Sequence, residues 1–131
     1  MLSIGAVKGF EIGDGFEAAR SNGSSNNDAF CIKDGKVVKA TNHSGGTLGG
    51  MSDGSTILFR AAVKPTPSIS SLQRTVNSSM EEVDISVKGR HDPIIVPRAV
   101  VVVESMAALT TADLLLRNMS ASMDHLFRIY R

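Results

Sequence analysis

Short apolar runs separated by glycine, proline and small polar residues fill the first two thirds of the chain, and the last third is almost continuously apolar. The run Val7–Ile12 stops at Gly13-Asp14-Gly15, which predicts a strand followed by a turn. Residues Ser55–Val63 alternate in polarity, with these apolar side chains on one face: Ile57, Phe59, Ala61 and Val63. Period-two alternation predicts a half-buried strand, and the two prolines of Lys64–Ser68 should end it because proline has no N–H for the ladder.

A β-hairpin is predicted over residues 30–38. Phe30-Cys31-Ile32 and Val37-Val38 flank an Asp34-Gly35 pair, which suits a type I′ turn with positive φ at both central residues. Cys31 would then lie in a strand, as a buried and inert thiol. The remaining short segments predict a helical turn or two in Phe16–Arg20, a surface loop in Ser21–Asp28, an ambiguous stretch in Ser70–Met80 and a strand in Val83–Val87.

The carboxy-terminal third predicts two helices. Pro97 is well placed to open the first, because its missing N–H costs nothing there. Ala99–Leu116 is apolar around most of a helical circumference, so we expect a long buried helix, with a strand over Val100–Val103 as the alternative. Met119–Tyr130 should form a second, amphipathic helix. The order of elements predicts an α+β fold, and no linker divides the chain, so residues 1–131 are expected to form a single domain.

Composition narrows the function classes. Hydrophobic residues make up 42% of the 131 residues and the formal net charge is +1, which is ordinary for a soluble globular protein and gives no reason to expect nucleic acid as a partner. Arg98, Glu104 and Asp113 interrupt the most apolar window and argue against a membrane helix. Met1–Lys8 lacks a signal-peptide pattern, and the single cysteine, Cys31, fits a reducing compartment, so a cytoplasmic location is expected.

Three segments could carry chemistry. Gly45–Gly54 holds five glycines in ten residues, whose N–H groups could cradle an anion or a flat ring, or which could simply form a flexible turn. Lys64–Ser68 could fix a phosphate with its cation and hydroxyls, or could be only a proline turn that ends a strand. Gly89–Pro93 places an arginine, a histidine and an aspartate before a helix start, which suits anion binding, although an ordinary polar loop fits the spacing equally well.

Other site types find little support in the sequence. The candidate metal ligands are scattered without a metal-binding spacing: Cys31, His43, His91 and His125. No HExxH or CxxC pattern is present, and no GxSxG elbow marks a nucleophilic serine. We therefore predict no metal site.

Taken together and in order, several short motifs resemble the carboxy-terminal portion of the chorismate synthases. The matching segments are Ala6–Phe16, Asn27-Asp28, Thr41-Asn42, Gly45–Gly50, Lys64–Ile69, Gly89–Ala99 and Glu104–Ala107. The resemblance runs from about Ser3 to Arg117, and Gly89–Ala99 is its most specific part.

The resemblance implies a fold and an activity. The family fold is a β-α-β sandwich, of which this chain would be a partial domain with antiparallel strands and the long helix. Chorismate synthases are lyases of the shikimate pathway that remove phosphate from 5-enolpyruvylshikimate 3-phosphate to give chorismate. They need reduced FMN, which NADPH reduces in some members, and the family enzyme is typically a homotetramer.

The resemblance also carries site residues onto this chain. Gly5 and Ala6 match a pair that contacts FMN, and Gly49 matches a glycine lining the flavin. Lys64, Pro65, Thr66, Pro67 and Ser68 match the segment that wraps the cofactor. Arg90 matches an arginine at the flavin and substrate phosphates, which a guanidinium binds bidentately. Asp92 matches a carboxylate near the reactive edge of the flavin and is expected to assist proton removal.

Departures from the family limit these expectations. Many relatives carry asparagine in place of Gly5, and the family's two substrate-site histidines and several substrate-binding arginines have no counterpart in this sequence. The chain alone is therefore expected to be inactive, with about half of a flavin site. The alternatives are a non-enzymatic flavin- or phosphate-binding module and an assembly fragment, in which exposed apolar surface on Ala99–Arg117 would drive self-association.

Overall fold

The computed structural model describes residues 1–91 and 93–130. They divide into two compact units, of which one spans Leu2–Val63 and the other comprises Met1 and Lys64–Arg131. Antiparallel strand pairs fill the first unit, and a strand pair and two helices form the second, so the predicted α+β class is confirmed.

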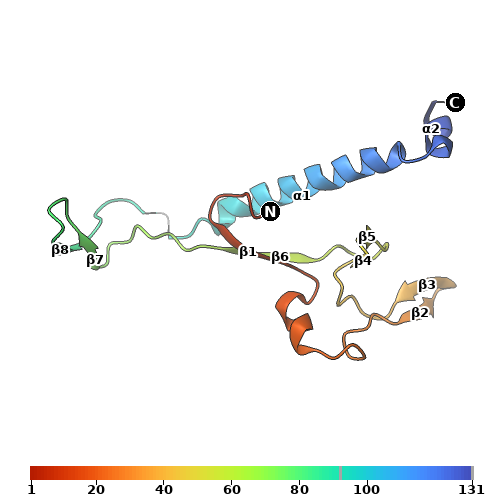
Figure 1. Cartoon of the computed structure of the whole chain (residues 1–131), viewed down its shortest axis with the longest axis horizontal. Coiled ribbons are helices and arrows are strands. Elements are labelled where there is room, and N and C mark those ends of the chain that lie inside the picture. Colours follow the sequence, from red (N-terminus) through yellow and green to blue (C-terminus); the bar gives the residue numbers. More distant parts are fainter. Residues whose placement is uncertain (92, 131) are drawn as a thin grey trace. The chain divides into compact units, whose positions relative to one another are not determined.

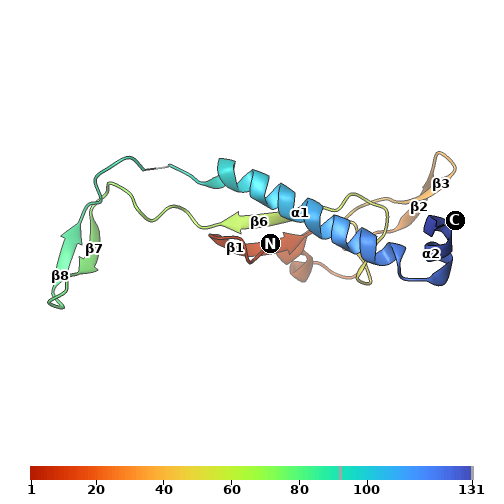
Figure 2. The same cartoon turned by 90° about the horizontal axis from the view of Figure 1, so that it is seen from above.

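The first unit is built on the pair β1 (Val7–Ile12) and β6 (Phe59–Val63), which lie side by side in Figures 1 and 2. The rings of Phe10 and Phe59 lie 5.5 Å apart between centroids. Arg60 and Glu11 are Cα partners across the ladder and form an ion pair with an N–O distance of 3.0 Å. Cross-strand pairs of these types stabilise antiparallel ladders, and β1 has the predicted bounds.

The predicted hairpin is confirmed as β2 (Phe30–Lys33) and β3 (Lys36–Lys39), with φ of 54° at Asp34 and 73° at Gly35. Cys31 is exposed, so the prediction of a buried thiol is wrong. Every residue of β2 is exposed, because no described element packs on either face of this hairpin closely enough to bury it. A 3₁₀ helix, η1 (Gly15–Arg20), occupies the segment for which one or two helical turns were predicted.

The glycine-rich segment contains a further small hairpin, β4 (Thr47–Leu48) and β5 (Met51–Ser52). The strand predicted from Ser55 begins only at Phe59. The preceding residues bond to the glycine segment instead: Leu58 donates its N–H to Gly45, and the carbonyl of Thr56 accepts from Asn42. The backbone groups needed for an earlier ladder are therefore already used.

The second unit begins where β6 ends, at the prolines predicted to end it. The ambiguous stretch holds β7 (Gln73–Val76), which pairs with β8 (Glu82–Ile85). β8 is the strand predicted over Val83–Val87, but it begins one residue earlier and ends two residues earlier. A long helix, α1 (Val96–Met119), follows with proline in its first turn, and α2 (Met123–Tyr130) follows a short bend (Figure 1). Both helices were predicted, and the alternative strand over Val100–Val103 is not formed.

The predicted burial of the long helix is wrong for the described chain, because no residue of α1 is buried. Among the described helices, α1 is also long and apolar enough to cross a membrane, judged by length and composition alone. Val7 is the one buried hydrophobic residue of the described chain. The other buried positions are glycines, Gly13, Gly45 and Gly46, so the tightest packing lies in the polar and glycine-rich part of the first unit.

Candidate functional site

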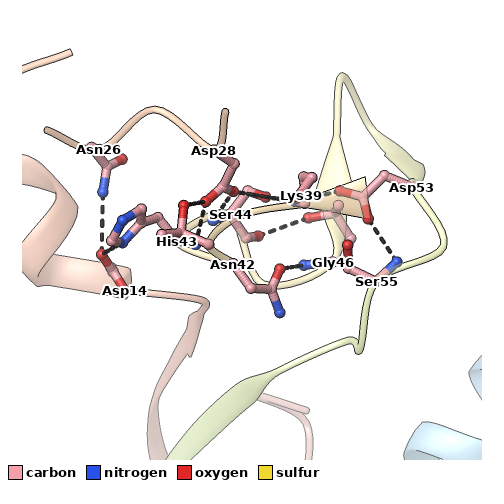
Figure 3. Close-up of polar contacts among 12 residues, drawn as sticks. Asp14, Asn26, Asp28, Lys39, Asn42, His43, Ser44, Gly46, Asp53 and Ser55 are labelled. Carbon is pink, nitrogen blue, oxygen red and sulfur yellow. Dashed lines mark hydrogen bonds and ion pairs between the residues drawn. The ribbon is translucent and has the colours of Figure 1, made fainter. Parts of the chain in front are cut away.

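The most highly connected part of the first unit is a cluster of polar side chains around the carboxylate of Asp28 (Figure 3). One oxygen, Oδ1, accepts from the backbone N–H of His43 and the hydroxyl of Thr41, each at 2.7 Å. The other, Oδ2, accepts from the N–H of Ser44 at 3.0 Å and from its hydroxyl at 2.7 Å. Asp28 therefore fixes the backbone that leads into the glycine-rich segment.

Lys39, the last residue of β3, links this carboxylate to a second one. Its Nζ lies 2.6 Å from Oδ2 of Asp53, 2.7 Å from the Ser44 hydroxyl and 3.2 Å from Oδ2 of Asp28. The three charged side chains are almost fully buried, with 4% of the Lys39, 7% of the Asp28 and 11% of the Asp53 side chain exposed. An ammonium group has three donors, and here each one has an acceptor.

The electrostatics of the cluster favour its charged form. Burial opposes ionisation of Asp28, but the hydrogen bonds from Ser44, Thr41 and His43 outweigh burial and hold its pKa well below the usual range. The hydrogen bond to Asp53 raises the pKa of Lys39, and the same bond lowers the pKa of Asp53. All three groups are therefore ionised across the neutral range.

A second contact ties the same backbone to the turn after β1. His43 Nδ1 lies 2.6 Å from Oδ2 of Asp14, which also accepts from Asn26 at 3.2 Å. The N–H of Asp14 donates to the His43 carbonyl at 2.8 Å. In the described chain no group of three or more His, Cys, Asp or Glu side chains is arranged to hold a metal ion.

The residues that the family resemblance assigns to FMN in this unit are accessible. Gly49 lies in the turn between β4 and β5 with φ of 58°, and no described atom lies within 4 Å of the point where a side chain would begin. Gly5 is equally open, and Ala6 has φ of 65°, an uncommon conformation for a residue with a side chain. Because glycine has no side chain, a planar ring could approach the backbone closely at Gly5 and Gly49.

The residues of the second unit that the resemblance assigns to the cofactor are mostly exposed, except for the hydroxyl of Thr66. Thr66 Oγ1 is buried and has no hydrogen-bond partner among the described residues. Lys64, Pro65 and Pro67 are exposed, and Ser68 is half-buried. Arg90 is exposed, and a ring nitrogen of the adjacent His91 lies 2.8 Å from the Val87 carbonyl oxygen. Asp92, the predicted catalytic carboxylate, lies outside the described residues.

The predicted site residues are divided between the two units. Gly5, Ala6 and Gly49 belong to Leu2–Val63, and Lys64–Ser68 and Arg90 belong to the other unit. The convergence of Gly49, Thr66 and Arg90 on one cofactor stays a prediction. The cluster of Asp28, Lys39 and Asp53 was not predicted as a site, although Asp28 is part of the resemblance.

Comparison with known proteins assigns the family. The family model for chorismate synthase matches residues 1–116 of this chain. The chain belongs to the chorismate synthase family. A curated chorismate synthase from Agathobacter rectalis is 68% identical over 131 residues, which is all of this chain and 36% of the relative. One from Archaeoglobus fulgidus is 63% identical over 117 residues, or 88% of this chain and 32% of the relative.

The chain thus spans about a third of the length of the chorismate synthases it matches. A crystal structure of a chorismate synthase is also similar, at 46% identity and a TM-score of 0.48, covering 51% of this chain and 20% of that one. The family match confirms the resemblance seen in the sequence.

Proposed function

We propose that this chain supplies part of the FMN and substrate site of a chorismate synthase, which eliminates phosphate from 5-enolpyruvylshikimate 3-phosphate to give chorismate. Reduced FMN would supply the electron density that helps expel phosphate. The proposal takes residues 1–131 as part of one domain of a cytoplasmic enzyme. It also takes the long helix not to span a membrane, because three charged residues interrupt its apolar sequence: Arg98, Glu104 and Asp113. It also takes the assembled enzyme to be a homotetramer, with NADPH as a possible source of reducing equivalents.

The described residues fit a flavin in three respects. Gly49 offers open backbone, Ala6 holds an uncommon φ, and Thr66 has a buried hydroxyl that bonds to no other group in the described part of the chain. The last observation carries the proposal, because a buried hydroxyl that makes no hydrogen bond costs free energy and is expected where a ligand completes the bond. It also lies in the segment for which the resemblance implies contact with the cofactor.

Each residue has a chemical task under this proposal. Gly5, Ala6 and Gly49 would let the flavin ring approach the backbone, and Lys64–Ser68 would wrap it with Thr66 as a hydrogen-bond partner. Arg90 would bind phosphate oxygens through its guanidinium fork. Asp92 would accept a proton near the flavin's reactive edge.

Replacing Thr66 by valine tests the proposal, since valine keeps the shape and removes the hydroxyl. We expect the affinity for FMN, followed by flavin fluorescence, to fall about tenfold, which is about 1.4 kcal/mol. The melting temperature should stay the same or rise, because the lost hydroxyl had no partner. Thr75→Val, at an exposed position of β7, is the matched control and should change neither quantity. A stability loss with unchanged FMN affinity would contradict the assignment.

We further propose that turnover needs residues from the other two thirds of the enzyme. The chain alone, assayed anaerobically with reduced FMN and 5-enolpyruvylshikimate 3-phosphate, should form no chorismate. Adding the complementary part of the Agathobacter rectalis relative should restore some turnover. Robust turnover by this chain alone would show that the missing histidines and arginines are dispensable.

A non-enzymatic flavin-binding module is the second candidate, favoured by the open turn at Gly49. Such a module should bind FMN at micromolar concentration or better on its own, whereas a partial site should bind it weakly. A titration of the chain with FMN therefore separates the two.

A further inference from the structure

Lys39 lies at the point where the two ends of the glycine-rich loop, residues 44–53, come together. At the first end it donates to the Ser44 hydroxyl, and at the second it donates to the carboxylate of Asp53. Figure 3 shows Lys39 between Asp28 and Asp53. One ammonium group thus bridges residues that are separated by the whole loop.

The hairpin within the loop contributes little to holding its shape. Its hairpin consists of two residue pairs, Thr47–Ser52 and Leu48–Met51, and a two-stranded hairpin of this size is not stable by itself in water. Glycines at four of its positions, 45, 46, 49 and 50, increase the conformational entropy that ordering must overcome. Leu48 and Met51 are exposed and add no core.

Asp53, one member of the cluster, also makes contacts with the backbone at the base of the loop. Asp53 donates its N–H to the Gly46 carbonyl at 3.1 Å, and its Oδ1 accepts from the N–H of Ser55 at 2.9 Å. Asn42 accepts from the N–H of Gly46 at 2.8 Å. Without Lys39, two carboxylates would be left close together with little solvent, which is unfavourable for the closed base.

We propose that Lys39 is a positioning residue that closes the base of the glycine loop and thereby holds the Gly49 turn in the conformation that receives the flavin. The inference rests on the proposed function for its flavin part. Lys39 does not touch the ligand under this proposal and acts through Asp28, Ser44 and Asp53. The effect on the loop can be measured without FMN and the effect on the ligand with it.

The experiment replaces Lys39 by methionine, which keeps the length of the side chain and removes its charge and donors. Lys36→Met, an exposed lysine on the same strand, is the matched control. Amide hydrogen exchange is measured by NMR in the absence of ligand at Gly46 and Asp53. The β1–β6 ladder, which contains neither Lys39 nor Lys36, is the internal reference. FMN affinity is then measured on the same samples by fluorescence.

We expect exchange at Gly46 and Asp53 to accelerate at least tenfold in Lys39→Met, with no change in the β1–β6 ladder, and FMN affinity to fall at least tenfold. Lys36→Met should match the original chain. Asp53→Asn retains an acceptor for Lys39, so its exchange rates and FMN affinity should lie between those of the original chain and of Lys39→Met. This variant tests the inference if Lys39→Met does not fold.

Unchanged exchange at the loop base in both variants would overturn the inference. Accelerated exchange with unchanged FMN affinity would overturn the link to the flavin and leave a contact that is only structural. If the original chain shows no FMN binding but the exchange result holds, the proposed function fails for this chain, while closure of the loop by Lys39 stands.

Discussion

Gly13 and Gly45 bring two backbone segments into direct contact: a side chain on Gly45 would begin 2.3 Å from the backbone nitrogen of Gly13. The turn after β1 is thereby packed against the start of the glycine loop, and both residues are buried. Both also have positive φ, 55° and 67°. The glycine loop is therefore held by backbone packing at its base, whereas Gly49 and Gly50 at its tip are open.

This contact predicts different costs for two alanine substitutions. Gly45→Ala combines unfavourable φ with overlap against backbone and should lose about 3 kcal/mol or more of the free energy of unfolding. Gly50→Ala, at φ of 79° with nothing within 4 Å, carries only the backbone strain, about 1–2 kcal/mol. Chemical denaturation followed by circular dichroism measures both. Equal losses would show that the contact between Gly13 and Gly45 does not constrain the fold.

Arg90 should distinguish flavins with and without phosphate. Under the proposed function its guanidinium binds phosphate oxygens, and lysine keeps the charge but loses the bidentate geometry. We expect Arg90→Lys to weaken FMN binding about tenfold and to leave riboflavin binding unchanged, because riboflavin has no phosphate. Equilibrium titrations with the two flavins provide the comparison. Arg74→Lys, on β7, serves as the control. An equal loss of affinity for FMN and riboflavin would show that Arg90 does not bind the phosphate group.

Local signals in the sequence predicted most of the secondary structure. The Asp34-Gly35 turn adopts positive φ at both residues, Val7–Ile12 forms β1, and proline lies in the first turn of α1. Each of these depends on backbone sterics within a few residues. The predicted burial of Cys31 and of the long helix was wrong. Burial depends on whether other segments pack against a residue, and no described segment buries Cys31 or any residue of α1.

The polar cluster could have been found from the hairpin register. The Asp34-Gly35 turn pairs Lys33 with Lys36 and Phe30 with Lys39, and continuing this register places Thr41 opposite Asp28. The hydrogen bond between Thr41 and Asp28 fits that placement. The contact of Lys39 with Asp53 had no such signal, since it depends on how the glycine loop folds back. The flavin residues were assigned through family resemblance, and their convergence depends on the relation between the two units.

The charged cluster predicts a defined dependence of stability on pH. The pKa values of Asp28 and Asp53 are lower in the folded state than in the unfolded chain, so the two carboxylates stabilise the fold at pH values above the ordinary aspartate pKa of about 3.9. This stabilisation is lost as the pH falls through their folded-state pKa values. The pKa of Lys39 is higher in the folded state, so its ammonium group stabilises the fold at pH values below the ordinary lysine pKa of about 10.4. This stabilisation is lost as the pH rises through the folded-state pKa. The contribution should therefore be constant from about pH 5 to 9.

Asp28→Asn measures this contribution. Its melting temperature should lie roughly 10 °C below that of the original chain at pH 7, and the difference should shrink as the pH approaches about 2. Thermal melts at several pH values give the difference directly. Asp34→Asn, in the exposed β2–β3 turn, is the control. A difference that widened on acidification would mean that Asp28 is not held in its ionised form by the cluster.

The exposed apolar side chains of α1 should make the chain self-associate. Val101, Leu109 and Leu116 are 62%, 63% and 64% exposed and lie within one face of the helix by their spacing. Contiguous apolar surface of this kind drives association in water, so light scattering should show an oligomer. Leu109→Lys together with Leu116→Lys should shift the chain toward monomer, because burying two ammonium groups opposes association. Thr111→Lys, on the other side of the helix, should leave the oligomer intact. A strictly monomeric original chain would show that this face is not an association surface.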